Sequence, residues 1–324
     1  MGADSKIEWT DASWTPIRAR RDGRVGWHCE HVSPGCVNCY SETMNLRLGT
    51  GRAFAPDERK AGGVEVFLDQ AMLLAPLKWK HPRKIFVCSM TDLFADFVEE
   101  AWLDAIFSIM AMCPQHTFQV LTKRSERMLA YMTALTAEIE SDIWTSRLGR
   151  MIGRVSKFAG HAFPGNAIFE LMNNDEEWKA HPDVIRRAGG WPARQIWMGV
   201  STEDQRRANE RIPHLLATPA AVHFLSCEPL LGAVDLKWAL SRNPIEIASD
   251  NLRRGMFSPG LETLRQIDLV IVGGESGPKR RPMDLAWARS LRDQCAAAEV
   301  SFFMKQIDKV QPIPDDLLVR EFPT

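Results

Sequence analysis

Short apolar runs rich in β-branched residues alternate along this chain with longer stretches whose apolar residues recur every three or four positions. The first pattern is typical of buried strands and the second of amphipathic helices. Strands are predicted at 84–89, 117–121, 195–200, 221–226, 268–272 and 301–304. Helices are predicted at about 98–112, 126–138, 203–217 and 284–298. This order predicts an α/β fold with a parallel sheet and crossover helices.

One more strand near the cysteine-rich segment at 29–39 would bring the sheet to seven strands. We therefore predict a TIM-type (β/α) barrel, complete or partial, with an open doubly wound sheet as the alternative. The barrel would form one domain over residues 1–306, with insertions at about 141–194 and 235–266, where the alternation breaks down. The first insertion is predicted to be helical. The last stretch, 307–324, contains three prolines and is predicted to be a surface tail.

Composition and charge narrow the class of protein. A chain of 324 residues with 45% hydrophobic residues can bury a large core. Its 40 basic and 41 acidic residues leave a net charge of -1, so a general attraction to nucleic acid is not expected and only a local basic patch would bind it. No long apolar run and no amino-terminal secretion signal occur in the sequence, so we expect a cytoplasmic protein without a membrane partner.

The seven cysteines fall into three groups. Cys113 and Cys295 continue apolar stripes at helical spacing and are predicted to lie in the core. Cys88 and Cys227 come at predicted strand ends, where either can supply a ligand to a nearby site. The remaining three form the segment WHCEHVSPGCVNCYSE, a C-x6-C-x2-C motif on Cys29, Cys36 and Cys39. An odd number of cysteines in a cytoplasmic chain favours free thiols or metal ligands over disulfides.

The Pro34-Gly35 pair inside this motif predicts a turn that brings the thiols together. Three thiolates can bind zinc with a fourth ligand, for which His28 and His31 are the candidates. They can also hold three irons of a 4Fe-4S cluster and leave the fourth iron open to another ligand. The spacing alone leaves both kinds of metal site open.

Polar residues follow each predicted strand, at the edge where parallel sheets place their sites. Those we expect to bind a cofactor are Ser89, Asp92, Lys123, Ser201, Glu203, Glu228, Gly273, Gly274, Glu275 and Ser276. Paired glycines allow close approach of the backbone to a ligand, and the carboxylate of Glu275 suits an amino group. Lys123 and Arg124 suit a carboxylate or phosphate. Arg124, Lys305 and Gln306 are the expected substrate contacts.

The whole chain resembles a phage-associated family of unknown function that is related to radical S-adenosylmethionine (SAM) barrels. The stretches that carry the resemblance run from residue 6 to about 306: KIEWTDASWTPI, VSPGCVNCYSE, FVCSMTDLF, HTFQVLTKRSERM, WMGVSTEDQ, FLSCEPLLG, VIVGGESGPKRRPM and FFMKQ. The resemblance implies that Cys29, Cys36 and Cys39 hold a 4Fe-4S cluster and that SAM binds its open iron, with Tyr40 beside the cofactor. The expected reaction is reductive cleavage of SAM to a deoxyadenosyl radical, which modifies a small molecule, a nucleotide or nucleic acid. A reductant protein such as flavodoxin or ferredoxin would supply the electron.

Two other function classes are compatible with the residues. One is a zinc- or cluster-bearing protein that binds or processes DNA without SAM chemistry. The other is a metal-stabilised barrel with hydrolytic chemistry, in which Asp92, Glu228 or Glu275 acts as the general base. No serine-histidine-aspartate order, HExxH motif or phosphate-binding loop in the sequence supports the hydrolytic class.

Overall fold

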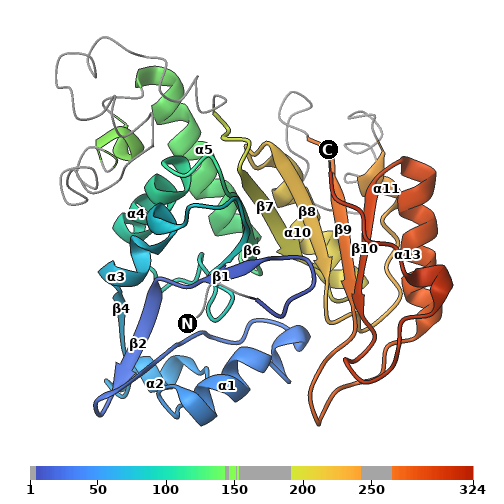
Figure 1. The fold of residues 1–324 in the computed structure, drawn as a ribbon, viewed down its shortest axis with the longest axis horizontal. Coiled ribbons are helices and arrows are strands. Elements are labelled where there is room, and N and C mark those ends of the chain that lie inside the picture. The colour runs from blue at the N-terminus through green and yellow to red at the C-terminus, as the bar shows by residue number, and fades with distance from the viewer. Residues whose placement is uncertain (1–4, 143–145, 151, 153–190, 242–264, 324) are drawn as a thin grey trace.

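The computed structural model describes residues 5–142, 146–150, 152, 191–241 and 265–323. Seven parallel strands form one sheet that curls into a half-barrel (Figure 1). Their order in the sheet is their order in the chain: β1 (Ala12–Trp14), β5 (Lys84–Val87), β6 (Thr117–Thr122), β7 (Ile196–Ser201), β8 (Val222–Cys227), β9 (Leu269–Gly273) and β10 (Ser301–Gln306). The six predicted strands and the seventh near the cysteine-rich segment are all present.

This strand order excludes the open doubly wound alternative, because such a sheet reverses direction at a switch point and this one does not. The closed barrel is also wrong, since β1 and β10 stand at opposite ends of the described sheet. The outer edge of β10 is occupied by the carboxyl-terminal segment. Phe303 forms an antiparallel bridge with Arg320, and the N–H of Met304 donates to the carbonyl of Val319 at 2.8 Å. The edge that would close the barrel is therefore already hydrogen-bonded.

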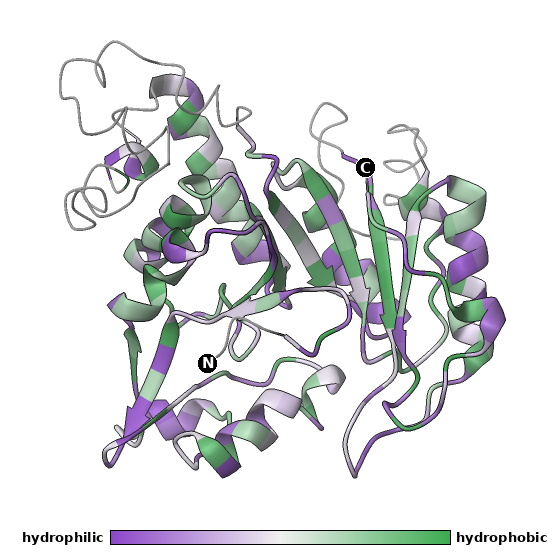
Figure 2. Ribbon diagram, in the orientation of Figure 1, coloured by the Kyte–Doolittle hydropathy of each residue, from purple (hydrophilic) through white to green (hydrophobic). Residues whose placement is uncertain are grey.

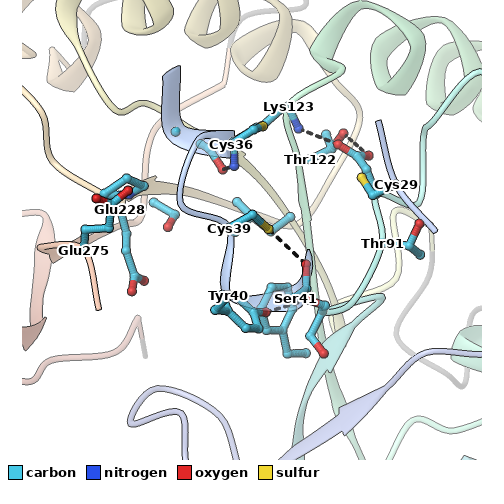
Figure 3. Close-up of a pocket in the computed structure, with 18 of the residues that line it drawn as sticks. Cys29, Cys36, Cys39, Tyr40, Ser41, Thr91, Thr122, Lys123, Glu228 and Glu275 are labelled. Carbon is cyan, nitrogen blue, oxygen red and sulfur yellow. Dashed lines mark hydrogen bonds between the residues drawn. The ribbon is translucent and has the colours of Figure 1, made fainter. Parts of the chain in front are cut away.

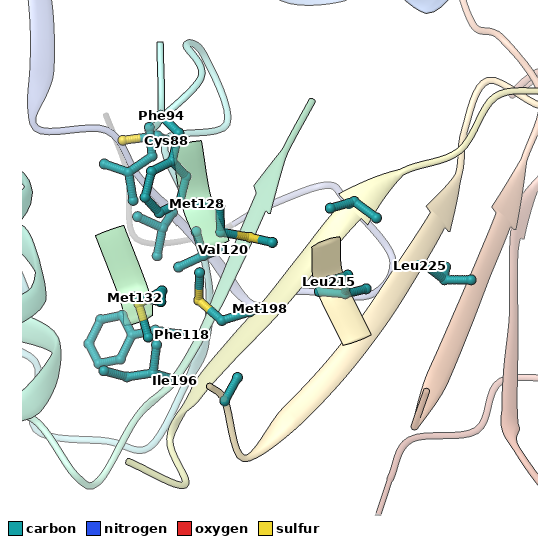
Figure 4. Packing of buried hydrophobic residues seen from close by; sticks show 14 of the residues in the cluster. Cys88, Phe94, Phe118, Val120, Met128, Met132, Ile196, Met198, Leu215 and Leu225 are labelled. Carbon is teal, nitrogen blue, oxygen red and sulfur yellow. The ribbon is translucent and has the colours of Figure 1, made fainter. Parts of the chain in front are cut away.

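The main helices pack on the convex face of the sheet. They are α4 (Glu100–Ala111), α5 (Ser125–Asp142), α10 (Gln205–Ala217) and α13 (Leu285–Ala298), close to the predicted ranges. Their apolar sides meet the strands and their polar sides face outward (Figure 2). Figure 4 shows Met128 and Met132 of α5 beside Phe118, Val120 and Met198 of the sheet. This packing buries the outward-pointing half of each strand.

The concave face of the half-barrel has an apolar core of its own. Trp9, Phe86, Trp197, Phe224, Leu269, Ile271 and Phe303 form this second cluster. Residues on one strand alternate between the two clusters, as Val270 and Ile271 do, because side chains in a strand point to opposite faces. Gly199 leaves room for its neighbour Phe224, whose ring would lie 2.5 Å from a Cβ at that position. Aromatic rings thus fill the lower part of the half-barrel.

The chain between β1 and β5, which pair directly in the main sheet, contains a small antiparallel sheet. Its strands are β2 (Ile17–Arg21), β3 (Arg24–Gly26) and β4 (Glu65–Leu68), in the order β3-β2-β4. Helices α1 (Tyr40–Leu48), α2 (Pro56–Lys60) and α3 (Gln70–Leu73) belong to the same insertion, followed by a 3-10 turn at Ala75–Lys78. The cysteine motif lies between β3 and α1. Figure 1 shows α1 and α2 beside β2, across from the sheet.

The predicted insertions fall mostly outside the described residues, at 153–190 and 242–264. The described part of the second includes the short helix α11 (Lys237–Leu240). Residues 307–323, which belong to the predicted surface tail, run along β10 and contain a 3-10 turn at Asp315–Leu317 whose Leu317 is fully buried. Among the described helices, none has both the length and the apolar character that crossing a membrane requires.

Candidate functional site

A cavity of about 360 Å³ opens at the carboxyl edge of the sheet, with the cysteine loop (residues 29–39) at its rim. Figure 3 shows Glu228 and Glu275 on one side of Cys36 and Cys39, and Cys29 on the other side, with Lys123 and Thr122 between Cys36 and Cys29. The predicted site residues that line it are Cys29, Cys36, Cys39, Tyr40, Ser89, Asp92, Lys123, Arg124, Ser201, Glu228, Gly274, Glu275, Ser276 and Lys305. Glu203, Gly273 and Gln306 do not line the cavity.

The pleat of the strands explains which exit residues reach the cavity. Lys123 comes two residues after Leu121, and Lys305 two residues after Phe303, both of which belong to the concave-face cluster or pack on it. Because strand side chains alternate with a period of two, Lys123 continues the concave face of β6. Ser201 follows Gly199 in the same way. Lys305 stands where the register of β10 shifts, and it lines the same cavity. Residues from β6, β7 and β10 thus enter one cavity.

The cysteine loop forms the turn that its Pro-Gly pair predicts. Pro34–Cys36 is a 3-10 turn in which the N–H of Cys36 donates to the carbonyl of Ser33 at 2.9 Å. Cys39 is the residue that caps α1, and the hydroxyl of Tyr40 donates to the carbonyl of Ser89. The last cysteine is therefore held between the turn and the first residue of a helix.

The three loop thiols are free and lie close enough to influence one another. Burial raises the pKa of the Cys29 thiol to about 12, with further contributions from Asp92, Cys39 and Cys36. Cys39 Sγ lies 3.0 Å from the hydroxyl of Ser41. Within the described ranges, no three His, Cys, Asp or Glu side chains are already arranged around one metal position. Three thiols on one short loop over one cavity nevertheless fit a thiolate-bound cluster, because metal coordination itself deprotonates such thiols.

The carboxylate of Glu203 is hydrogen-bonded to the middle of the cysteine loop. Its Oε1 accepts the N–H of Gly35 at 3.3 Å, and its Oε2 accepts from Arg211 Nη1 at 2.8 Å. Burial alone would raise the pKa of Glu203, but the charges of Arg211 and Lys123 outweigh it and hold that pKa below its ordinary value. The carboxylate is thus a buried anion that holds the loop rather than a wall of the cavity.

Asp92 and Arg124 anchor the start of the loop. Asp92 accepts from the Thr122 hydroxyl at 2.6 Å, from the N–H groups of Phe94 and Lys123, and from Arg124 Nη1 at 3.0 Å. Arg124 Nη2 in turn donates to the carbonyl of Glu30 at 3.1 Å. All four acceptor positions of this carboxylate are occupied, so Asp92 is poorly suited to act as a general base.

Glu275 anchors the end of the loop through Arg281. The two residues form a bidentate pair at 2.6 and 3.1 Å, and the Glu275 carboxylate also accepts from Asn38 Nδ2 at 2.8 Å. Arg281 Nη2 donates to the carbonyl of Pro34 at 2.9 Å. Burial opposes ionisation, but the hydrogen bonds from Arg281 and Asn38 hold the pKa of Glu275 below its ordinary value. Its carboxylate is therefore engaged by the protein itself.

The interior of the cavity holds two lysines. Lys305 Nζ donates to Glu228 Oε1, and Lys123 Nζ donates to the hydroxyl of Ser201 at 3.1 Å. Of the three carboxylates considered as a general base, Glu228 is the one with the fewest hydrogen bonds. Its Oε1 is nevertheless already occupied by the ammonium group of Lys305.

Of the two adjacent glycines, Gly274 is required by the packing of the chain. A Cβ on Gly274 would lie 2.0 Å from the carbonyl oxygen of Ile307, whereas a Cβ on Gly273 would meet only ordinary contacts from 3.4 Å outward. Gln306 Nε2 donates to the carbonyl of Gly274 at 2.9 Å and thus fastens the exits of β9 and β10 together. Close approach of backbone to backbone explains this glycine without a ligand.

The four cysteines outside the loop differ in their surroundings. Cys113 and Cys295 are fully buried in the convex-face core, which confirms the prediction. Cys227 lies in the same core with its Sγ 3.1 Å from the Thr202 hydroxyl. Cys88 is also a buried member of that core, but it lines the cavity as well.

Neither zinc-ligand candidate lines the cavity. His28 is buried against Phe54 and Phe97, and His31 Nε2 lies 3.1 Å from Glu42 on the exposed side.

Asn38, Arg211, Arg281 and Trp9 are site residues that the sequence did not reveal. Asn38 stands directly before the last cysteine and Arg281 lies in the segment PKRRPM, so their neighbourhood was visible in the sequence. Their roles were not, because the contact between Arg281 and Pro34 joins positions 247 residues apart.

Comparison with known proteins identifies a family for this chain. No curated protein and no solved structure shows significant similarity to this chain. One family model, described as Protein of unknown function (DUF5131), matches residues 4–314, which include every strand and the whole cysteine loop. Because the match covers nearly the whole sequence, the chain belongs to the DUF5131 family.

Proposed function

We propose that this chain is a radical SAM-type iron–sulfur enzyme that holds a 4Fe-4S cluster on Cys29, Cys36 and Cys39. The observation that carries the proposal is that the loop between β3 and α1 brings three thiols to one cavity at the carboxyl edge of a parallel half-barrel. Three loop thiols leave one iron of a four-iron cluster without a protein sulfur. When bound, such a cluster supplies the electron for reductive cleavage of SAM to a deoxyadenosyl radical.

The chain's own residues divide into two roles under this proposal. Glu203, Asp92 and Glu275 position the loop through Gly35, Arg124 and Arg281, so the thiols stay at the cavity rim. Residues inside the cavity bind the cofactor and a small-molecule or nucleotide substrate: Tyr40, Ser89, Lys123, Arg124, Ser201, Glu228, Ser276 and Lys305. A reductant protein such as flavodoxin or ferredoxin belongs to the same proposal.

Anaerobic reconstitution with iron and sulfide tests the proposal. We expect about four irons and four sulfides per chain, with absorbance from thiolate-to-iron charge transfer. A triple alanine variant of Cys29, Cys36 and Cys39 should lose both. The matched control is a triple alanine variant of Cys113, Cys227 and Cys295, whose thiols lie in the convex-face core. Stoichiometric zinc without iron uptake in the unaltered protein would refute the cluster.

A closed four-cysteine site is the second candidate, because Cys88 lines the same cavity as the loop thiols. Four thiolates would hold zinc or a cluster without an open metal position, as in a structural or electron-transfer site of a DNA-binding or DNA-processing protein. The variant Cys88→Ala separates the two candidates. Unchanged iron and sulfide content supports the open cluster, and loss of the metal supports the closed site.

A further inference from the structure

We propose that the cavity binds a ligand with two chemical parts, a flat heteroaromatic ring and an oxyanion, and that this ligand is a nucleoside phosphate. The ring would lie on Trp9 and Phe86, and the phosphate would bind Lys123. This inference rests on the proposed function in one respect, because it names the substrate class of the same cavity. Its evidence lies in the charges and the apolar floor, which do not depend on a cluster.

The charged groups of the cavity leave one partly buried cation, Lys123, without a carboxylate partner. Four lining carboxylates each have a cation as partner, in the pairs Glu30–Arg59, Asp92–Arg124, Glu228–Lys305 and Glu275–Arg281. Lys123 bonds instead to the neutral hydroxyl of Ser201. Glu203, whose pKa Lys123 helps to lower, is already bonded to Arg211 at 2.8 Å.

Three lysines line the cavity; Lys305 is paired with Glu228, and Lys309 is exposed and therefore solvated. A cation turned into a partly enclosed cavity is costly without a counter-charge, so Lys123 favours an anionic ligand.

The floor of the cavity is apolar and aromatic. Trp9 and Phe86 line it with ring centroids 4.7 Å apart, and Leu121 lies beside them on β6. Trp9 is 2% exposed, and its indole N–H has no hydrogen-bond partner in the described structure. Because this N–H lies in the ring plane and is itself covered, a ligand in the cavity would meet the indole through its ring face. Stacking on the two rings, rather than a hydrogen bond, would hold the flat part of the ligand.

The two features together select the ligand class. Inorganic phosphate would use Lys123 and leave the aromatic floor uncovered, whereas an apolar ligand would cover the floor and leave the cation unpaired. The cavity volume of about 360 Å³ lies within the range of small-molecule sites, roughly 300–1,000 Å³. A nucleoside phosphate combines a flat ring, hydrogen-bond acceptors and an oxyanion in one molecule of that kind.

Calorimetric titration of the purified protein without added iron tests the inference, with adenosine monophosphate, adenosine, inorganic phosphate and SAM as probes. We expect the monophosphate to bind at least about tenfold more tightly than adenosine, with inorganic phosphate weakest. Lys123→Gln should lower monophosphate affinity to the level of adenosine, while adenosine affinity stays unchanged. Lys123→Arg should retain most of the affinity. Lys279→Gln, on an exposed lysine that does not line the cavity, is the charge-matched control.

Retained adenosine affinity also shows that the Lys123→Gln variant is folded. If that variant fails to fold, Trp9→Phe gives a second test, because it keeps an aromatic ring but reduces the stacking surface. It should weaken adenosine and the monophosphate by the same factor.

Three results would overturn the inference: equal affinity for adenosine and its monophosphate, no binding of either, or an effect of Lys123→Gln on SAM alone. The last would assign Lys123 to the cofactor carboxylate.

Iron uptake is measured separately, so the two proposals fail independently. A protein that takes up four irons and binds no nucleotide refutes only the substrate class. A protein that binds the monophosphate and takes up no iron refutes only the proposed cluster.

Discussion

Glu203 at the exit of β7 accepts a hydrogen bond from the backbone N–H of Gly35, in the middle of the cysteine loop, at 3.3 Å and across 168 positions of sequence. The same carboxylate pairs with Arg211, and both side chains are buried. This ion pair is thus one of three anchors of the loop, beside Asp92–Arg124 and Glu275–Arg281. It is the one that links the position of the loop to a pair in which both side chains are buried.

Replacing this carboxylate should destabilise the protein strongly. Glu203→Gln leaves Arg211, 5% exposed, as a buried cation without its anion. Breaking one partner of a buried pair costs about 3–5 kcal/mol, so we expect a loss of that size in the free energy of unfolding. Urea denaturation measures it. Glu210→Gln, which removes an exposed pairing on the same helix, should cost no more than about 1 kcal/mol. A loss below that value in Glu203→Gln would contradict the anchoring role.

The free energy of unfolding should depend on pH through the carboxylates of Glu203 and Glu275. The pKa values of Glu203 and Glu275 are both held below the ordinary value of 4.5 in the folded protein. Their charged forms therefore stabilise the fold fully above that value, and the contribution is lost as pH falls through the lowered folded values. Denaturation series from pH 7 to pH 3 should show stability falling on the acid side of this range. Glu203→Gln should flatten the fall, and an unchanged slope would count against it.

Adjacent glycines should respond differently to alanine. Gly274→Ala places a Cβ 2.0 Å from the carbonyl oxygen of Ile307, so the exits of β9 and β10 must separate. We expect a loss of about 1–3 kcal/mol, the usual cost of overpacking. Gly273→Ala, with its nearest contact at 3.4 Å, is the control and should change the free energy of unfolding little. Equal losses in both variants would show that the packing argument is wrong.

Two of the core cysteines, Cys113 and Cys295, should matter for stability alone. Cys113 and Cys295 are fully buried in the convex-face core, where a thiol behaves as a small hydrophobe. Alanine at either position should lower the free energy of unfolding by roughly 1 kcal/mol and leave iron content unchanged. Metal analysis and thermal denaturation of the same samples measure both effects. Iron loss in either variant would place a ligand where the structure shows core.

Local patterns in the sequence determined the strands and helices of the fold and the turn in the cysteine loop. Runs such as LVIVG are apolar throughout because a parallel strand is covered on both faces, and this pattern is legible without any partner. The helix spacing that places Cys113 and Cys295 in the core is equally local. The Pro-Gly turn between Cys29 and Cys39 depends only on neighbouring residues as well.

Tertiary structure decided which polar residues face the cavity and which hold the loop. Glu275 precedes Arg281 by only six residues, yet its role follows from bonds to Asn38 and from the bond between Arg281 and Pro34. The barrel likewise fails to close at β10 because the carboxyl-terminal segment pairs with that strand, through Phe303 and Arg320. Such contacts join distant positions through the three-dimensional path of the chain. Local hydropathy and spacing carry no information about them, so the sequence indicated a site at the strand exits and the fold assigned each residue its role.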